Sequence, residues 1–88
     1  MKRPRYVLAR EPETGHPEHL VAEILLSGVR RASEVLVDAN EDRLVVNTRP
    51  KQYSLDVHLP YDLVDEQIGC QFDVRTQLLT VTMPVKPE

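Results

Sequence analysis

Apolar and polar residues alternate along much of the chain, and this pattern predicts β-strands. Between Tyr53 and Leu59 every second residue is apolar, and the positions between them carry Ser54, Asp56 and His58. Successive side chains of a strand point to opposite faces, so a period of two is typical of a half-buried strand. Similar patterns predict strands in six further segments: residues 5–10, 19–26, 34–39, 43–48, 68–72 and 79–83.

Turn-forming residues separate these segments. Residues 11–17 contain two prolines and a glycine, and Ser27–Gly28 ends the second predicted strand. Asn40–Asp42 lies between two β-branched runs and predicts a tight hairpin turn. Pro50 and Pro60 close two further strands. Short strands joined by turns predict an all-β fold, a seven-stranded antiparallel β-sandwich.

The length of 88 residues indicates one domain. A chain of this size buries roughly 60–65% of its unfolded surface, which allows a small core. We expect the sandwich to span residues 5–85, with frayed ends at residues 1–4 and 86–88. Residues 63–67 could form one helical turn, which is too short to change the fold class.

Strand periodicity also separates inward from outward side chains. If Leu79 and Val81 face the core, then Leu78, Thr80 and Thr82 face outward. Leu36 has the opposite parity to its two valine neighbours, so it also points outward. Pro84 cannot donate a ladder hydrogen bond and is expected to end the last strand. The predicted core residues are Leu20, Ile24, Leu55, Val57, Phe72, Leu79, Val81 and Met83.

Charge and cysteine content narrow the classes of partner and compartment. A net charge of −3 argues against non-specific nucleic-acid binding. Apolar runs are only a few residues long, so no membrane contact is expected. The single cysteine, Cys70, cannot form an internal disulfide, which favours a cytoplasmic or nuclear protein. Cys70 lies on the apolar side of its segment and is expected to act as a small buried hydrophobe.

No cluster of residues predicts catalysis or a cofactor, so we expect no enzyme activity, no cofactor and no metal. His16 and His19 have a spacing that could hold a metal on a helix, but a proline interrupts the segment and no third ligand is near. Asp56 and His58 share one strand face and could tune a general base. The nearest nucleophile on that face, Ser54, lies about 13 Å from His58 along the strand, too far for a triad.

One short motif suggests modification. Arg30-Arg31-Ala32-Ser33 matches the R-R-x-S pattern of basophilic kinase substrates. Such tetrapeptides are common by chance, so the motif alone is a weak signal. A phosphate on Ser33 would add charge just ahead of a predicted strand.

Without catalytic residues, the default function is protein binding, and exposed sheet edges can accept a partner strand. We therefore expect a partner segment to pair with a sheet edge or to lie across an outward face. The outward residues predicted to contact it are Leu78, Thr80, Thr82 and Leu36.

Several motifs resemble one family. Leu59-Pro60-Tyr61, Phe72-Asp73 and the stretch L-T-V-T-M-P-V at residues 79–85 occur in the order found in the C-terminal CS domain of PIH-domain proteins. The hairpin N-E-D-R-L-V-V at residues 40–46 is similar to a turn of the same family. Together these motifs cover roughly residues 5–85.

The resemblance implies a CS-domain or α-crystallin-like sandwich that acts as a co-chaperone adaptor. It implies direct binding to a tetratricopeptide-repeat partner, and through that partner an indirect link to heat shock protein 90 and to AAA+ ATPases. The clients implied are large assemblies: RNA polymerases, snoRNPs and PIKK kinases. The family's separate N-terminal PIH domain, which reads acidic phosphopeptides, is not present in these residues.

Two alternatives remain open. The first is a CS or α-crystallin-like holdase or direct chaperone-binding module. A holdase needs a larger exposed apolar patch or oligomerisation. CS domains that bind heat shock protein 90 directly tend to carry tryptophan, and this chain has none. The second is an enzyme that uses Asp56 and His58, which the sequence supports poorly.

Overall fold

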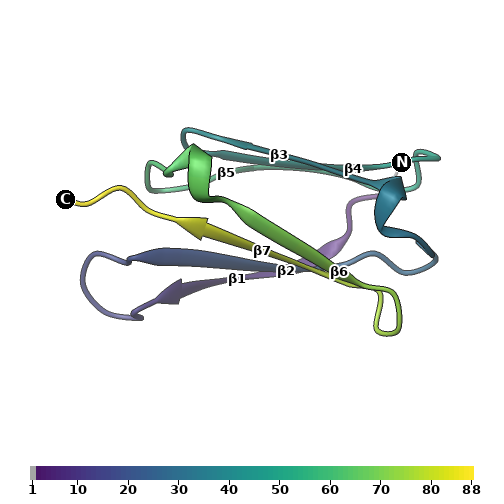
Figure 1. Cartoon of the computed structure of the whole chain (residues 1–88), viewed down its shortest axis with the longest axis horizontal. Coiled ribbons are helices and arrows are strands. Elements are labelled where there is room, and N and C mark those ends of the chain that lie inside the picture. The colour runs from purple at the N-terminus through teal and green to yellow at the C-terminus, as the bar shows by residue number, and fades with distance from the viewer. Residues whose placement is uncertain (1) are drawn as a thin grey trace.

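A computed structural model describes residues 2–88 and contains two antiparallel sheets (Figure 1). One sheet has four strands in the order β1-β2-β7-β6, and the other has three in the order β3-β4-β5. The predicted seven-stranded antiparallel sandwich is confirmed. The strands are β1 Arg5–Glu11, β2 His19–Leu25, β3 Val35–Asn40, β4 Arg43–Thr48, β5 Ser54–His58, β6 Gly69–Asp73 and β7 Leu78–Pro84.

The last strand is central in its sheet. β7 pairs with β2 on one side and with β6 on the other, and Val81 lies opposite both Ala22 and Cys70. Its pairing with β2 runs from Leu78 to Pro84. Pro84 is the last residue of β7, as predicted from its missing N–H. Pairing continues one residue further, however, because Val85 bridges to Leu63 and its N–H donates to the Glu18 carbonyl at 2.9 Å.

The core lies between the two sheets. Side chains from both sheets form one buried cluster, and β2 alone contributes Leu20, Ala22 and Ile24 at 0% exposure. Six of the eight predicted core residues are buried. Val57 and Phe72 are only half-buried, but both pack against that cluster. Alternation therefore assigned every predicted core residue to the correct face.

Two 3₁₀ turns, η1 Ala32–Glu34 and η2 Asp65–Gln67, lie outside the sheets. The second falls within the predicted helical turn at residues 63–67. These short turns are the helical segments in the part of the chain that the structure describes, and neither could cross a bilayer.

The hairpin between β3 and β4 turns at Glu41–Asp42, as predicted. Glu41 adopts a left-handed conformation with φ of 54°. Its N–H donates to Asp65 Oδ1 at 3.0 Å, and its carbonyl accepts from the Leu63 N–H at 2.7 Å. The segment that leads into η2 therefore holds the tip of this hairpin in place.

One expectation needs correction. Cys70 is exposed, although its side chain has inward parity. It lies on β6, an edge strand, where the space between the sheets opens to solvent. In the N-terminal segment, the Lys2 N–H donates to the Gln52 carbonyl and the Lys2 carbonyl accepts from the Ser54 N–H, both at 3.0 Å. Met1, the first residue of that segment, lies outside the described residues. The expected fraying of residues 1–4 and 86–88 stays a prediction.

Candidate partner-binding surfaces

The structure divides the four predicted contact residues between two places. Leu78, Thr80 and Thr82 lie on β7 and face away from the core, on the outer side of the four-stranded sheet. Leu36 lies on β3, in the other sheet, and is 44% exposed. The predicted outward parity is thus correct at all four positions, but these residues form no single patch.

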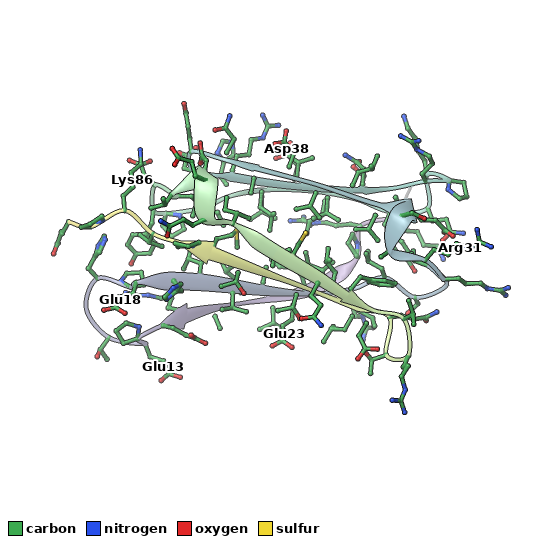
Figure 2. All side chains as sticks on the ribbon, viewed as in Figure 1. Glu13, Glu18, Glu23, Arg31, Asp38 and Lys86 are labelled. Carbon is green, nitrogen blue, oxygen red and sulfur yellow. The ribbon has the colours of Figure 1, made fainter. Side chains whose placement is uncertain are left out.

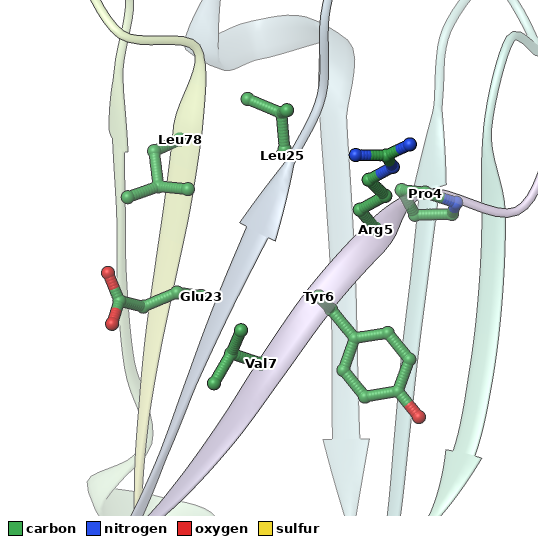
Figure 3. Close-up of a pocket in the computed structure, with 7 residues that line it drawn as sticks. All are labelled: Pro4, Arg5, Tyr6, Val7, Glu23, Leu25 and Leu78. Carbon is green, nitrogen blue, oxygen red and sulfur yellow. The ribbon is translucent and has the colours of Figure 1, made fainter.

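The first surface, which we call the β1–β2–β7 face, consists of Arg5, Val7, Glu23, Leu25 and Leu78 (Figure 3). These residues come from three adjacent strands and line an open pocket of about 610 Å³. Strand register places Leu25 opposite both Arg5 and Leu78, while Val7 lies opposite Glu23. Three apolar side chains are therefore bordered by one cation and one anion.

Exposure marks this face as unusual. Val7 is 64% exposed and Leu25 is 38% exposed, and both are among the few exposed large apolar residues. A single exposed leucine or valine is ordinary on a protein surface. Here two lie beside the half-buried Leu78 in one pocket and form a small contiguous apolar area.

The second surface, the β3–β6 groove, lies where the two sheets open between their edge strands. It has a volume of about 410 Å³ and is mostly apolar. The backbone beside it is also available, because β3 pairs only with β4 and β6 pairs only with β7. Such edges carry N–H and C=O groups that can accept a further strand. Its lining residues are Ala32, Val35, Leu36, Val37, Cys70, Phe72 and Leu79.

The outer side of the three-stranded sheet has a different character. Arg43 Nε donates to Asp56 Oδ1 at 2.8 Å, and a second guanidinium nitrogen of Arg43 contacts Oδ2. This hydrogen bond is the main cause of the lowered pKa of Asp56. The charges of Arg43 and His58 also lower that pKa. The same pair raises the pKa of Arg43. Asp56 therefore forms an ion pair with Arg43. Among residues 2–88, no hydrogen bond joins Asp56 to His58 as a catalytic dyad would require.

The two histidines near the β1–β2 connection lie in different settings. His16 Nε2 is 2.7 Å from the Lys86 carbonyl, and its ring meets Tyr61 edge-on at 5.4 Å. His19 is the first residue of β2 and lies opposite Glu11 and Pro84. Over the described range 2–88, no three His, Cys, Asp or Glu side chains gather where they could hold a metal ion.

Two contributors to these surfaces were missed from the sequence. Val7 has the same parity as Arg5 and Ala9, so strand alternation indicates an outward side chain. Inward and outward faces were not assigned to this strand from the sequence. Leu25 falls in an unbroken apolar run from Ile24 to Leu26, where alternation gives no answer. The β3–β6 groove joins strands that are distant in sequence, and no local pattern could reveal it.

Comparison with known proteins identifies the family. The PIH1 CS-like domain family matches residues 5–86. The chain is 48% identical to PIH1 domain-containing protein 1 of Xenopus laevis over 85 residues, and 48% identical to that of Danio rerio over 84 residues. These two matches cover 97% and 96% of this chain, but only 29% of the length of each relative.

More distant similarities agree. Protein kintoun of Danio rerio is 32% identical over 81% of the chain and 12% of that relative. Among solved structures, heat shock protein 16.0 from Schizosaccharomyces pombe has a similar fold, with a TM-score of 0.73 at 16% identity. That match covers 97% of this chain and 88% of the yeast protein. It supports the α-crystallin-like sandwich as the fold.

Proposed function

Because this chain belongs to the PIH1 CS-like domain family, we propose that it is a protein-binding adaptor domain of a PIH-type co-chaperone. Its direct partner is a tetratricopeptide-repeat co-chaperone. Through that partner it connects to heat shock protein 90 and AAA+ ATPases during assembly of RNA polymerases, snoRNPs and PIKK kinases. The site of action is the cytoplasm, the nucleus or both.

The observation that carries this proposal is the contrast between the outer sides of the two sheets. One side has the apolar pocket of the β1–β2–β7 face, with Val7 and Leu25 exposed. The other has an Arg43–Asp56 ion pair on its surface, and among the described residues a single large apolar side chain is exposed there, Leu36, which lies opposite Asn47. Exposed apolar side chains are costly to keep in water unless a partner covers them, so the first side is the stronger candidate for an interface.

The pocket also indicates what kind of segment would fit. An apolar side chain of the partner would lie among Val7, Leu25 and Leu78. Arg5 at the border favours an acidic residue on one side of that anchor, and Glu23 favours a basic residue on the other. We propose that a segment of the tetratricopeptide-repeat protein with this pattern lies across the face.

Calorimetric titration with the tetratricopeptide-repeat protein tests the proposal. Val7→Glu and Leu25→Glu each place a charge in the apolar pocket, and we expect binding to weaken at least about tenfold. Val74→Glu is the matched control: Val74 is 53% exposed in the turn after β6 and lines none of the described pockets. Circular dichroism would verify that all variants fold.

Two results would count against this assignment. Equal affinity of the native protein, Val7→Glu and Leu25→Glu would exclude the β1–β2–β7 face. A loss confined to Leu36→Glu would move the interface to the β3–β6 groove. Suppression of aggregation of an unfolded protein by the isolated domain, without any partner, would favour the holdase alternative.

A further inference from the structure

The connection from β2 to β3 carries a serine preceded by two arginines. Ser33 lies in η1, and Arg30, Arg31, Ala32 and Ser33 are all exposed. Figure 2 shows the Arg31 side chain extending away from the sandwich into solvent. In the whole sequence Ser33 is the one serine or threonine with arginine both two and three positions before it. The structure therefore presents this motif intact at the surface.

Local geometry allows this segment to enter an enzyme's cleft. Arg31 is already extended, with φ of −136° and ψ of 140°. The turn that holds Ser33 buries no residue and is closed by the Glu34 N–H donating to the Arg31 carbonyl at 3.1 Å and by the Val35 N–H donating to the Ala32 carbonyl. Opening it disrupts two backbone hydrogen bonds and uncovers no fully buried residue of the turn, a cost at the low end of local unfolding.

Firm contacts on both sides keep such an opening local. Val29 is 1% exposed, and its carbonyl accepts from Gln77 Nε2 at 3.3 Å. On the other side, the Glu34 carbonyl accepts from the Arg49 N–H at 2.7 Å. The segment between these anchors can adjust while the sandwich stays folded.

We propose that Ser33 is a phosphorylation site for an arginine-directed protein kinase, and that its phosphate charges one end of the β3–β6 groove. The Ser33 Oγ attacks the terminal phosphorus of ATP. An Oγ–P bond forms, the bond from that phosphorus to the bridging oxygen breaks, ADP leaves, and the hydroxyl proton passes to the kinase's catalytic base. Arginines before the serine supply the charge pattern by which such kinases select substrates.

The position of Ser33 would place the phosphate beside one end of the β3–β6 groove. Its neighbour Ala32 lines the β3–β6 groove, and Cys70 lines the same groove from the opposite edge strand. A phosphoserine carries about −1.5 to −2 charges at neutral pH. This charge makes the end of an apolar groove unfavourable for acidic or purely apolar segments, without any change in the β1–β2–β7 face.

The first test measures modification of the folded domain. The domain is incubated with ATP and the catalytic subunit of cyclic-AMP-dependent protein kinase, an arginine-directed enzyme, and the phosphorylated residue is located by mass spectrometry. We expect about one phosphate per chain, on Ser33. Ser33→Ala should abolish it, and Arg30→Gln with Arg31→Gln should slow it by on the order of tenfold or more, since charge complementarity guides recognition.

A synthetic peptide of residues 27–38 serves as the control for access. Modification of the peptide but not of the domain would show that the fold protects Ser33, and the proposal would be wrong. Modification of neither, or equal phosphate uptake by Ser33→Ala, would overturn it as well.

The second test uses Cys70 as a built-in reporter, because it is the single cysteine and is exposed. The domain reacts with dithiobis(nitrobenzoate), which is anionic, and with dithiodipyridine, which is neutral. Phosphorylation should lower the ratio of the anionic to the neutral rate by about twofold or more at low salt, since like charges within a Debye length repel. At roughly 1 M salt, where the Debye length is about 3 Å, the ratio should recover.

A rate ratio that phosphorylation leaves unchanged at low salt would disprove the effect on the groove. Kinase-treated Ser33→Ala controls for any direct effect of the reagents. Neither test involves the tetratricopeptide-repeat protein, so failure of the proposed function would leave this inference standing, and the reverse also holds.

Discussion

Thr48 shows how a single side chain organises a loop. It is the one polar residue among positions 2–88 whose exposure falls to a buried level, at 2%. Its Oγ1 accepts hydrogen bonds from the N–H groups of Gln52 and Tyr53, both at 3.0 Å, and donates to the Pro50 carbonyl at 3.1 Å. One hydroxyl therefore makes hydrogen bonds to three residues of the connection from β4 to β5.

We predict that Thr48→Val destabilises the protein by about 1–3 kcal/mol, since the Tyr53 N–H loses its acceptor in a partly buried place. The Gln52 N–H keeps its second acceptor, the Pro50 carbonyl at 2.8 Å. Valine keeps the shape of threonine, so packing changes little. Urea denaturation measures the difference. Thr82→Val, on the exposed side of β7, is the control and should change stability far less. Equal losses in both variants would contradict the role of the Thr48 hydroxyl.

The lowered pKa of Asp56 predicts that the stability of the folded protein depends on pH. The pKa of Asp56 in the folded protein is lowered from the ordinary value of 3.8, chiefly by the hydrogen bond from Arg43. A lowered carboxyl pKa stabilises the folded state above the unfolded pKa, and this contribution is lost as the pH falls through the folded pKa.

The native protein should therefore exceed Asp56→Asn in urea midpoint at neutral pH by a small amount, because the pair is exposed. The gap should narrow below pH 3.8 and with added salt. Denaturation of both proteins at several pH values measures it. A gap that is the same at pH 2 and pH 7 would argue against the ion pair.

At the scale of elements, the β3–β4 hairpin depends on one left-handed residue. Glu41 has a φ of 54°, a conformation that costs a non-glycine residue strain energy. The hydrogen bonds at this position involve only its backbone N–H and carbonyl, which glycine retains.

We predict that Glu41→Gly is at least as stable as the native protein. Asp42→Gly should lose roughly 0.5–1 kcal/mol, because Asp42 gains nothing from glycine's extra freedom. Thermal unfolding of the two variants compares adjacent turn positions directly. A larger loss for Glu41→Gly than for Asp42→Gly would refute the explanation.

Elements were predicted well from sequence because strand alternation is a local property. In the segments at residues 53–59 and 79–83, alternation within the segment alone indicates which side chains face the core. Cys70 shows the limit: its parity is inward, yet it is exposed because β6 is an edge strand. Edge or central position depends on which strands pair, and pairing between distant segments leaves no local periodic signal.

The same limit applies to the candidate surfaces. The outward direction of Leu78 followed from parity, but its neighbours depend on strand pairing. Leu25 is brought to Leu78 by the pairing of β2 with β7, and Val7 by the pairing of β1 with β2. The partner-binding role of Leu78, Thr80, Thr82 and Leu36 stays a prediction. The variants described above decide between the β1–β2–β7 face and the β3–β6 groove.

At the scale of the whole molecule, the two sheets depend on one shared core. Leu20 and Ile24 from one sheet join Leu44 and Leu55 from the other in a single buried cluster. Neither sheet has a second core to retain if the other unfolds. The sandwich should therefore unfold in one cooperative step, as small single domains usually do.

Amide hydrogen exchange measures this cooperativity. We predict the same free energy of opening for Ala22, on the inner strand β2, and for Val46, on the inner strand β4. The edge strand β6 should exchange more readily and serves as the internal comparison. Markedly weaker protection at Val46 than at Ala22 would mean that the three-stranded sheet opens by itself.

The central position of β7 has a consequence for the order of folding. β7 is the last of the seven strands to be synthesised, yet Leu20 pairs with Met83 and Phe72 pairs with Leu79. As the chain leaves the ribosome, β2 and β6 must therefore wait for residues 78–84 before their sheet can close. The contact between β2 and β7 joins segments that are distant in sequence, and such contacts slow folding and leave apolar surface uncovered meanwhile. The growing chain thus passes through a period in which it needs protection from aggregation itself.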